Sequence, residues 1–504
     1  MAFGHQGATG EVRVLSYGVP RAAIRQHGAS NLELAIDQMR RRNALWNRLV
    51  EIDRAIRAEQ SPLVAPYRER GERVPAEVKA ELRAIEERYR ETINAACRES
   101  GCYWCNYGDV KIAWQQARRK PDPPRFHRWD GTGKTVVSIA HGLPVSDVWG
   151  DHGMLRLRPR GTKPGDAFVF LRVGSEGRAP VWLVLPVRLH RPLPEDGRIR
   201  AAWAIREVIA GRDRWTVQFV VERPAGAWRT SAAPRAGRIA LDLGWRQRPG
   251  GMRVATWETD AGERGELVLP EWHQWAMQKV ADLQSIRDQV WNQTIAALSA
   301  WVEERERVPE WLREAARVWG QWRRKSHLVH LWARWRGERF AGDEIGFAIL
   351  ETWLARDRHL WEWEANLRDQ ALRRRREFYR VFAAGLARRY AEVVLEQFDL
   401  REVARRKADA DGEPGAATEL LAVARRHRQW AAVHELRQAI LNACQREGVT
   451  VTLVPARDTT VVCASCGSRE TFDRRALRHR CRSCGTEWDQ DENAARNLLR
   501  LAAA

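Results

Sequence analysis

Four cysteines near the C-terminal end of the sequence have the types and spacing of metal ligands. They form two Cys-x-x-Cys pairs, Cys463/Cys466 and Cys481/Cys484, with fourteen residues between the pairs and a glycine directly after each. Each pair can place two thiolates on one side of a tight turn, and two such turns complete a tetrahedral set for Zn²⁺. The alternative, four reduced and unligated cysteines, leaves the repeated Cys-x-x-Cys-Gly unexplained. We therefore predict a structural zinc ribbon.

Three acidic residues occupy comparable places in different elements. Asp242 lies in a short apolar strand expected at 238–243, Glu396 at the end of a buried strand, and Asp491 at the start of a final helix behind the cysteines. Carboxylates at strand ends and a helix N-terminus of one α/β sheet can converge on a pair of divalent cations, which phosphodiester hydrolysis uses to activate water and neutralise the leaving oxygen. With a β-meander after the first strand, this order is typical of ribonuclease H-like nucleases. Taken singly, each acid could equally cap a helix or form a salt bridge.

The composition indicates a polyanionic partner. The chain has 504 residues and a net charge of +20, a positive excess that favours nucleic acid binding. Its length predicts roughly three to five modules. No apolar run reaches the roughly 18 residues of a membrane span, and the N-terminus lacks a signal peptide's apolar core, so we expect a cytoplasmic protein without a membrane partner. Three further cysteines, Cys97, Cys102 and Cys105, could suggest a second metal site, but ordinary buried thiols fit their spacing better.

The first half of the chain predicts a barrel interrupted by helices. Residues 11–19 alternate as a strand, and helical periodicity then begins, with Ser30 and Glu33 expected as a capping box. Several short strands with turn signals fill 136–222 and imply a compact barrel, which the strand at 11–19 would join. The helices would then be an insertion in the barrel.

The second half predicts the elements that position the acids. Strands at 238–243 and after it form the meander, a helical region at 272–390 is dense in tryptophan and arginine, and one helix is expected over 416–446. The tryptophans are expected mainly to pack between helices, with a minority free to stack on bases. The run Arg373 to Arg376 fits either a solvated face or phosphate contacts.

Three segments of this sequence resemble a known family. LDLG, LEQFDL and TTVVCASCGSRE…CRSCGTEWDQDENAARNLL are similar to the three RuvC motifs and the zinc ribbon of the TnpB transposon nucleases and of the type V CRISPR effectors that descend from them. The resemblance covers 236–500. Upstream, HRWDGTG and LGWR resemble the miniature type V-M and V-N effectors.

The resemblance assigns roles to individual residues. Asp242, Glu396 and Asp491 would be the catalytic residues and the ligands of Mg²⁺, with two ions expected. Asp489 matches a neighbouring acid rather than a ligand, and Asn493 would help to hold the start of the helix. The zinc would be structural and the magnesium catalytic.

The resemblance also implies a multidomain α+β fold. It would combine an OB-like wedge barrel, a helical recognition insertion, and an RNase H-like RuvC domain with a helical insertion and an inserted zinc ribbon. The expected boundaries are 1–29 for the first wedge segment, 30–118 for the recognition domain, 119–235 for the second wedge segment, 236–458 for the RuvC domain with its insertion at about 272–390, 459–488 for the ribbon, and 489–504 for the RuvC C-terminal helix.

The function implied is that of an RNA-guided DNA endonuclease. Its partners would be a guide RNA (crRNA, with or without tracrRNA) and PAM-flanked double-stranded DNA, with a monomer on each guide. Some type V-M relatives have lost the first-strand aspartate and silence DNA without cutting it, so the presence of Asp242 favours a nuclease. Three alternatives stay open: a binding-only silencer of the same fold, a transposon-encoded nuclease, and a zinc-ribbon DNA-binding protein that uses no guide.

Overall fold

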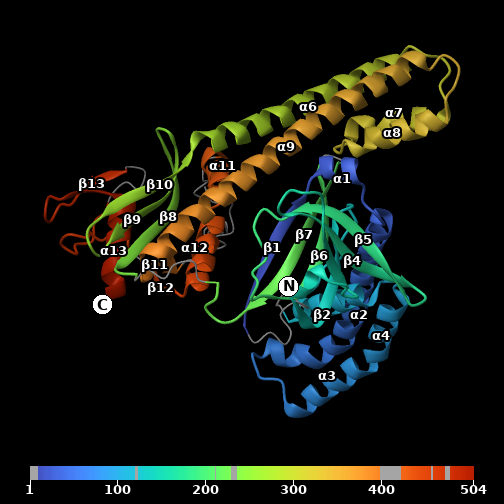
Figure 1. Cartoon of the computed structure of the whole chain (residues 1–504). Helices are drawn as coiled ribbons and strands as arrows, with labels where there is room; N and C mark the ends of the chain where they lie inside the picture. Colours follow the sequence, from blue (N-terminus) through green and yellow to red (C-terminus); the bar gives the residue numbers. More distant parts are fainter. Residues whose placement is uncertain are drawn as a thin grey trace. The chain divides into compact units, whose positions relative to one another are not determined.

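The chain forms two compact units in the computed structural model, Met1–Trp228 and Arg229–Ala504 (Figure 1). The structure describes residues 10–119, 123–209, 212–228, 235–397, 422–455, 458–471 and 477–503. Each unit has its own apolar cores. Within the described ranges, no helix combines the length and hydrophobicity that a bilayer span needs.

Two antiparallel sheets form the framework of the first unit, in the orders β1-β7-β6-β2 and β3-β4-β5. Alternate side chains of both sheets, such as Tyr17, Val169 and Phe219, share one core because successive strand residues point to opposite faces. The strand expected at 11–19 pairs with β7 along its whole length. The elements are β1 (Glu11–Val19), β2 (Gly133–Pro144), the 3₁₀ turn η1 (Ser146–Trp149), β3 (Leu155–Pro159), β4 (Asp166–Glu176), β5 (Ala179–Arg188), β6 (Arg198–Ile209) and β7 (Arg212–Arg223).

Five helices lie between β1 and β2 in the chain, four of them around a second core that includes Leu49, Ile56 and Trp114. They are α1 (Arg21–His27), α2 (Leu32–Glu69), α3 (Ala76–Arg88), α4 (Arg90–Glu99) and α5 (Trp104–Arg118). The capping box expected at Ser30 is wrong. The main chain of Ser30 instead pairs with Val184 of β5, and α2 begins after it without a side-chain cap.

A five-stranded mixed sheet forms the base of the second unit, in the order β10-β9-β8-β11-β12. β8 (Arg238–Arg248), β9 (Gly251–Thr259) and β10 (Arg264–Pro270) form an antiparallel meander, while β11 (Glu392–Gln397) and β12 (Thr450–Pro455) continue the sheet in parallel with β8. The strand expected at 238–243 was too short. β8 passes a bulge and pairs again with β9 at Arg246, because its polar half gains ladder partners that an apolar pattern does not reveal.

Two long helices, α6 (Glu271–Glu303) and α9 (Glu344–Arg389), pack against each other and leave the sheet as a pair (Figure 1). α7 (Glu310–Val318), the 3₁₀ turn η2 (Trp319–Gln321) and α8 (Ser326–Gly337) lie between them in the chain. Trp301, Trp335 and Trp353 are buried in the shared core. The expectation of packing therefore holds for some of the tryptophans, whereas others, such as Trp275 and Trp363, are exposed.

The single helix expected over 416–446 is wrong where the structure describes it, and residues 416–421 lie outside the described residues. α11 (Ala422–Ala431) and α12 (Val433–Glu447) are separated at Ala432, which has a left-handed conformation. The carbonyls left without helical partners are taken by buried side chains. Arg375 Nη1 donates to the Trp430 carbonyl at 2.8 Å, and the Tyr379 hydroxyl donates to the Ala431 carbonyl. Buried side chains of α9 thus stabilise a break that local sequence does not encode.

The C-terminal region contains the short hairpin β13 (Arg478–Arg480) and β14 (Glu487–Asp489), followed by α13 (Gln490–Ala503). α13 packs on the central strands through Leu498, which shares a core with Ala240, Val394 and Val454. The helix follows the cysteine segment directly in the chain.

Candidate acidic site and cysteine cluster

Asp242 and Glu396 lie side by side on neighbouring parallel strands. The register pairs Leu241 of β8 with Leu395 of β11, so the next residue on each strand is an acid at the same level. The two carboxyl side chains are hydrogen-bonded to each other. Burial, followed by the negative charges of Glu396 and Asp491, raises the pKa of Asp242 well above its usual range. Two ionised carboxylates at this distance repel each other, so the pair favours a nearby positive charge.

Glu396 is also held by a threonine from the segment before the cysteines. The Thr459 hydroxyl donates to Glu396 Oε1 at 3.2 Å, and Arg437 of α12 donates to the Glu396 main-chain carbonyl at 3.4 Å. Burial raises the pKa of Glu396, the hydrogen bonds from Thr459 and Asp242 lower it, and the charge of Asp491 raises it again. These contacts fix the direction of the carboxylate toward Asp242.

Asp491 is the second residue of α13, and both of its carboxylate oxygens contact arginines. Arg246 of β8 lies 3.3 Å from Oδ2 and 3.4 Å from Oδ1, and Arg253 Nη2 of β9 donates to Oδ2. Arg253 also forms two 3.1 Å bonds with the buried carboxylate of Asp489. The third acid is therefore close enough to influence Asp242 and is at the same time neutralised by two guanidinium groups.

Asp489 and Asn493, expected to support the site without binding its cation, both make hydrogen bonds at the start of α13. Asp489 Oδ1 accepts the main-chain N–H of Asp491 at 2.9 Å and so caps the start of α13. The Asn493 amide accepts the N–H of Ala464 at 2.8 Å and donates to the Val462 carbonyl at 2.7 Å. These contacts tie the helix to the segment that carries the first cysteine pair.

Arg246, Arg253 and Asn497 are site residues that the sequence pattern did not predict. Asn497 Nδ2 donates to the carbonyls of Thr459 and Val462 at 2.8 and 2.7 Å. One signal was available for Arg253. It stands among apolar residues in the expected second strand of the meander, and a charge inside such a strand requires a buried partner.

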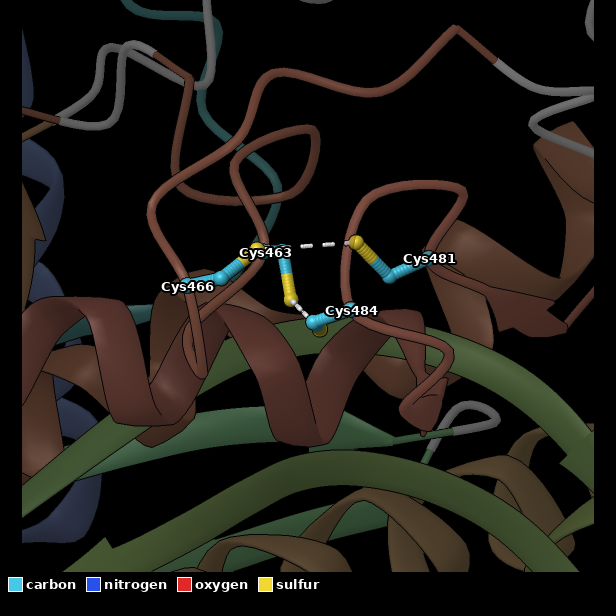
Figure 2. Close-up of side chains that lie close together, drawn as sticks. All are labelled: Cys463, Cys466, Cys481 and Cys484. Carbon is cyan, nitrogen blue, oxygen red and sulfur yellow. Dashed lines mark hydrogen bonds between the residues drawn. The ribbon is translucent and has the colours of Figure 1, made fainter.

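The four predicted cysteines meet in one cluster (Figure 2). Their sulfur atoms all lie within 4.8 Å of one another, with Cys463 and Cys484 3.8 Å apart and Cys466 and Cys481 3.6 Å apart. The two turns are alike. In each, the N–H of the glycine after the pair, in a left-handed conformation, bonds to the carbonyl of the first cysteine.

The donors of this cluster fit a tetrahedral metal ion. A metal–sulfur bond of about 2.3 Å places tetrahedral sulfurs about 3.8 Å apart, close to both measured separations. Among the described residues it is also the only group of three or more His, Cys, Asp or Glu whose ligand atoms approach this closely. Cys97, Cys102 and Cys105 do not form such a group, and burial raises the pKa of each thiol. The ligand atoms of Asp242, Glu396 and Asp491 do not approach one another as closely as the four sulfurs do, since Asp491 faces arginines.

The base of the α6/α9 pair presents exposed tryptophans beside cations. Trp275 is 65% exposed and lies one helical turn from Lys279, whose ammonium group is 5.5 Å from the ring centre of Trp363. Arg374 lies 4.3 Å from the ring centre of Trp272. We call Trp275, Lys279 and Trp363 the tryptophan face. Flat aromatic rings next to positive charge suit the bases and phosphates of a single strand.

Comparison with known proteins agrees with the resemblance. The chain is 37% identical to the CRISPR-associated DNA-binding protein Cas12m of Allomeiothermus silvanus over 94% of both chains. The chain belongs to the Cas12m family. It is also 38% identical to Cas12m of Thermanaerosceptrum fracticalcis, over 84% of this chain and 73% of that protein. The family description Cas12f1-like, TNB domain, matches residues 434–498.

This membership confirms the predicted likeness to miniature type V CRISPR effectors. Among solved structures, a cryo-EM complex of Cas12f1 with sgRNA and target DNA aligns over 97% of this chain and 98% of that chain. The identity is 10% and the TM-score 0.41, a similarity too low to support an argument about function.

Proposed function

We propose that this chain is an RNA-guided DNA-binding protein of a type V CRISPR system. The observation that carries the proposal is the similarity to CRISPR-associated DNA-binding proteins along 94% of the chain. The net charge of +20 supports it, because a guide RNA and a target duplex are both polyanions. In such a system base pairing reads the target sequence, while the protein reads a short flanking motif and the A-form shape of the heteroduplex.

The proposal assigns a different function to each of the two units. The two sheets of the first unit hold the guide RNA scaffold, and the helices between β1 and β2 contact the PAM duplex. The mixed sheet of the second unit is a RuvC domain, and the tryptophan face next to it holds a displaced or unpaired strand. One protein copy binds each guide RNA.

The cysteine cluster is proposed to hold a structural zinc ion. Four thiolates are the ligands that Zn²⁺ prefers in closed sites, and the sulfur separations support this choice. Asn493 and Asn497 tie the cluster segment to α13. Zinc would thereby stabilise the position of the first turn of α13, where Asp491 lies.

A second candidate function, DNA hydrolysis by the RuvC domain, is favoured by the adjacent carboxylates of Asp242 and Glu396. Their proximity and raised pKa values fit a pair that binds a divalent cation, because the cation would offset the repulsion between the two negative charges. Mg²⁺ prefers such oxygen ligands and would supply an activated water molecule. Thr459 orients Glu396 for this task, and Asp491 completes the proposed catalytic set.

The experiment separates the two functions. The full chain is purified with a programmed guide RNA and tested for binding to matched and mismatched duplexes, and for nicking with Mg²⁺. Asp242→Asn should keep guided binding, and Asp282→Asn, which changes an exposed acid of α6, serves as the matched control. Binding that ignores the guide would refute the proposed function. If the unmodified protein binds under guidance but does not nick DNA, only the proposal of DNA hydrolysis is refuted. If Asp242→Asn nicks DNA as well as the unmodified protein does, the proposed catalytic role of Asp242 is refuted.

A further inference from the structure

Two arginines face each other directly across neighbouring strands at the edge of the acidic site. After the bulge in β8, Arg246 pairs in register with Arg253 of β9. Like charges directly opposite on a sheet repel each other, so this arrangement needs negative charge close by. Asp491 supplies it to both arginines, and Asp489 supplies it to Arg253.

Arg253 is held by a second carboxylate besides that of Asp491. Only 2% of its side chain is exposed, and its fork of N–H groups forms two 3.1 Å bonds with Asp489, itself 8% exposed. Asp489 is held in turn by the N–H of residue 491. A rotation of the Asp491 carboxylate would therefore leave the Arg253 guanidinium where it is, with its positive charge directed at the same place.

A divalent cation on Asp491 would meet this fixed charge. Arg246 lies within 3.4 Å of Asp491 from the other strand, so both oxygens of the carboxylate already have cationic partners. The contacts of the other two acids differ. Asp242 and Glu396 lie within hydrogen-bond reach of each other, and among the described contacts no arginine donates to either carboxylate, although the charge of Arg253 also lowers the pKa of Asp242.

We propose that Arg246 and Arg253 take the place of one cation, so that the acidic site holds a single divalent ion, between Asp242 and Glu396. This inference rests on the proposed role of those two acids as cation ligands. A guanidinium can donate to a phosphate oxygen but, unlike a metal ion, does not acidify a bound water molecule. The Asp491 side of the site is thus suited to holding a phosphate rather than to activating water.

The test counts Mn²⁺ ions on the full-length, zinc-loaded protein by electron paramagnetic resonance and titration calorimetry. The unmodified chain should bind one isolated Mn²⁺ that is lost in Asp242→Asn and kept in Asp282→Asn. Asp491→Asn should keep this ion, because Asp491 is paired with arginines rather than with the cation. Arg246→Gln together with Arg253→Gln should admit a second ion, with the spectrum of a coupled pair.

A coupled Mn²⁺ pair in the unmodified chain, or loss of the ion in Asp491→Asn, would overturn the arginine assignment and leave the cation site standing. Absence of any Mn²⁺ that depends on Asp242 would overturn the cation site itself. Since Arg253 is buried, its replacement can prevent folding. Asp491→Asn, which keeps the size of the side chain, decides the question without it.

Discussion

The contact between α13 and the cysteine segment gives a prediction whose magnitude follows from individual hydrogen bonds. Asn493→Ala leaves the N–H of Ala464 without its acceptor, whereas the Val462 carbonyl keeps a donor in Asn497. One buried N–H without a partner costs about 1–3 kcal/mol. Asn497→Ala should cost less, about 1 kcal/mol, because Asn493 still donates to the carbonyls of Thr459 and Val462.

The double variant should cost more than the sum of the two single substitutions. With both amides gone, the two shared carbonyls lose every donor from α13, and we expect a coupling free energy of about 1 kcal/mol or more. Asn442→Ala, on the exposed side of α12, is the matched control and should stay within about 0.5 kcal/mol.

Amide hydrogen exchange measured by mass spectrometry on peptides from 458–471 and 490–503 is the assay. A loss of about 2 kcal/mol should speed exchange there roughly 30-fold, with little change in the first unit. Additive effects of the two substitutions would refute the reasoning, because they would mean that the carbonyls do not depend on these amides.

Three further predictions concern other regions of the second unit. Arg253→Met should lower the free energy of unfolding by about 3–5 kcal/mol, since it leaves the buried carboxylate of Asp489 with only the more distant Arg248, at 3.9 Å, and Asp489→Asn in the same chain should restore some of this loss in urea unfolding. Burial lowers the pKa of His273 to about 4. The unfolded state therefore takes up a proton first as the pH falls from about 6.5 to 4, and stability should drop by up to about 3 kcal/mol in that window, a drop that His273→Gln should remove. Trp275→Ala with Trp363→Ala should weaken guided DNA binding by about tenfold or more in a gel-shift titration, because stacking contributes about 1–3 kcal/mol per base.

Each of these outcomes has a clear opposite. If the double variant Arg253→Met, Asp489→Asn unfolds at the same urea concentration as Arg253→Met alone, loss of the ion pair is not the cause of the destabilisation. If His273→Gln leaves the pH dependence of the thermal unfolding temperature unchanged, a group other than His273 causes the loss of stability in acid. Unchanged DNA binding after loss of both tryptophans would leave the tryptophan face without a role in the complex.

Local chemistry made several features predictable from sequence. The repeated Cys-x-x-Cys-Gly defines its own turn geometry, since each glycine permits the left-handed conformation that closes a knuckle. Alternation over 11–19 predicted β1, and short apolar runs ending in acids predicted the strands of Asp242 and Glu396. These patterns depend only on residues that are neighbours in the sequence, so they can be recognised without knowledge of the fold.

Other features depend on contacts between distant segments. The break at Ala432 exists because buried side chains of α6 and α9 take the freed carbonyls, and nothing near Ala432 indicates them. Contacts with distant segments also give the arginines of the run at 373–376 different environments. Arg375 is buried and holds the carbonyl of Trp430, whereas Arg374 is exposed beside Trp272.

The acidic site shows the same division most clearly. The sequence by itself determined which carboxylates could meet, because their strands and helix have recognisable patterns. Only the tertiary structure decided what surrounds them. The register of β8 against β11 places Asp242 beside Glu396, and the bulge in β8 brings Arg246 opposite Arg253. Strand register and the position of a bulge follow from pairing with another strand, and no single strand encodes them.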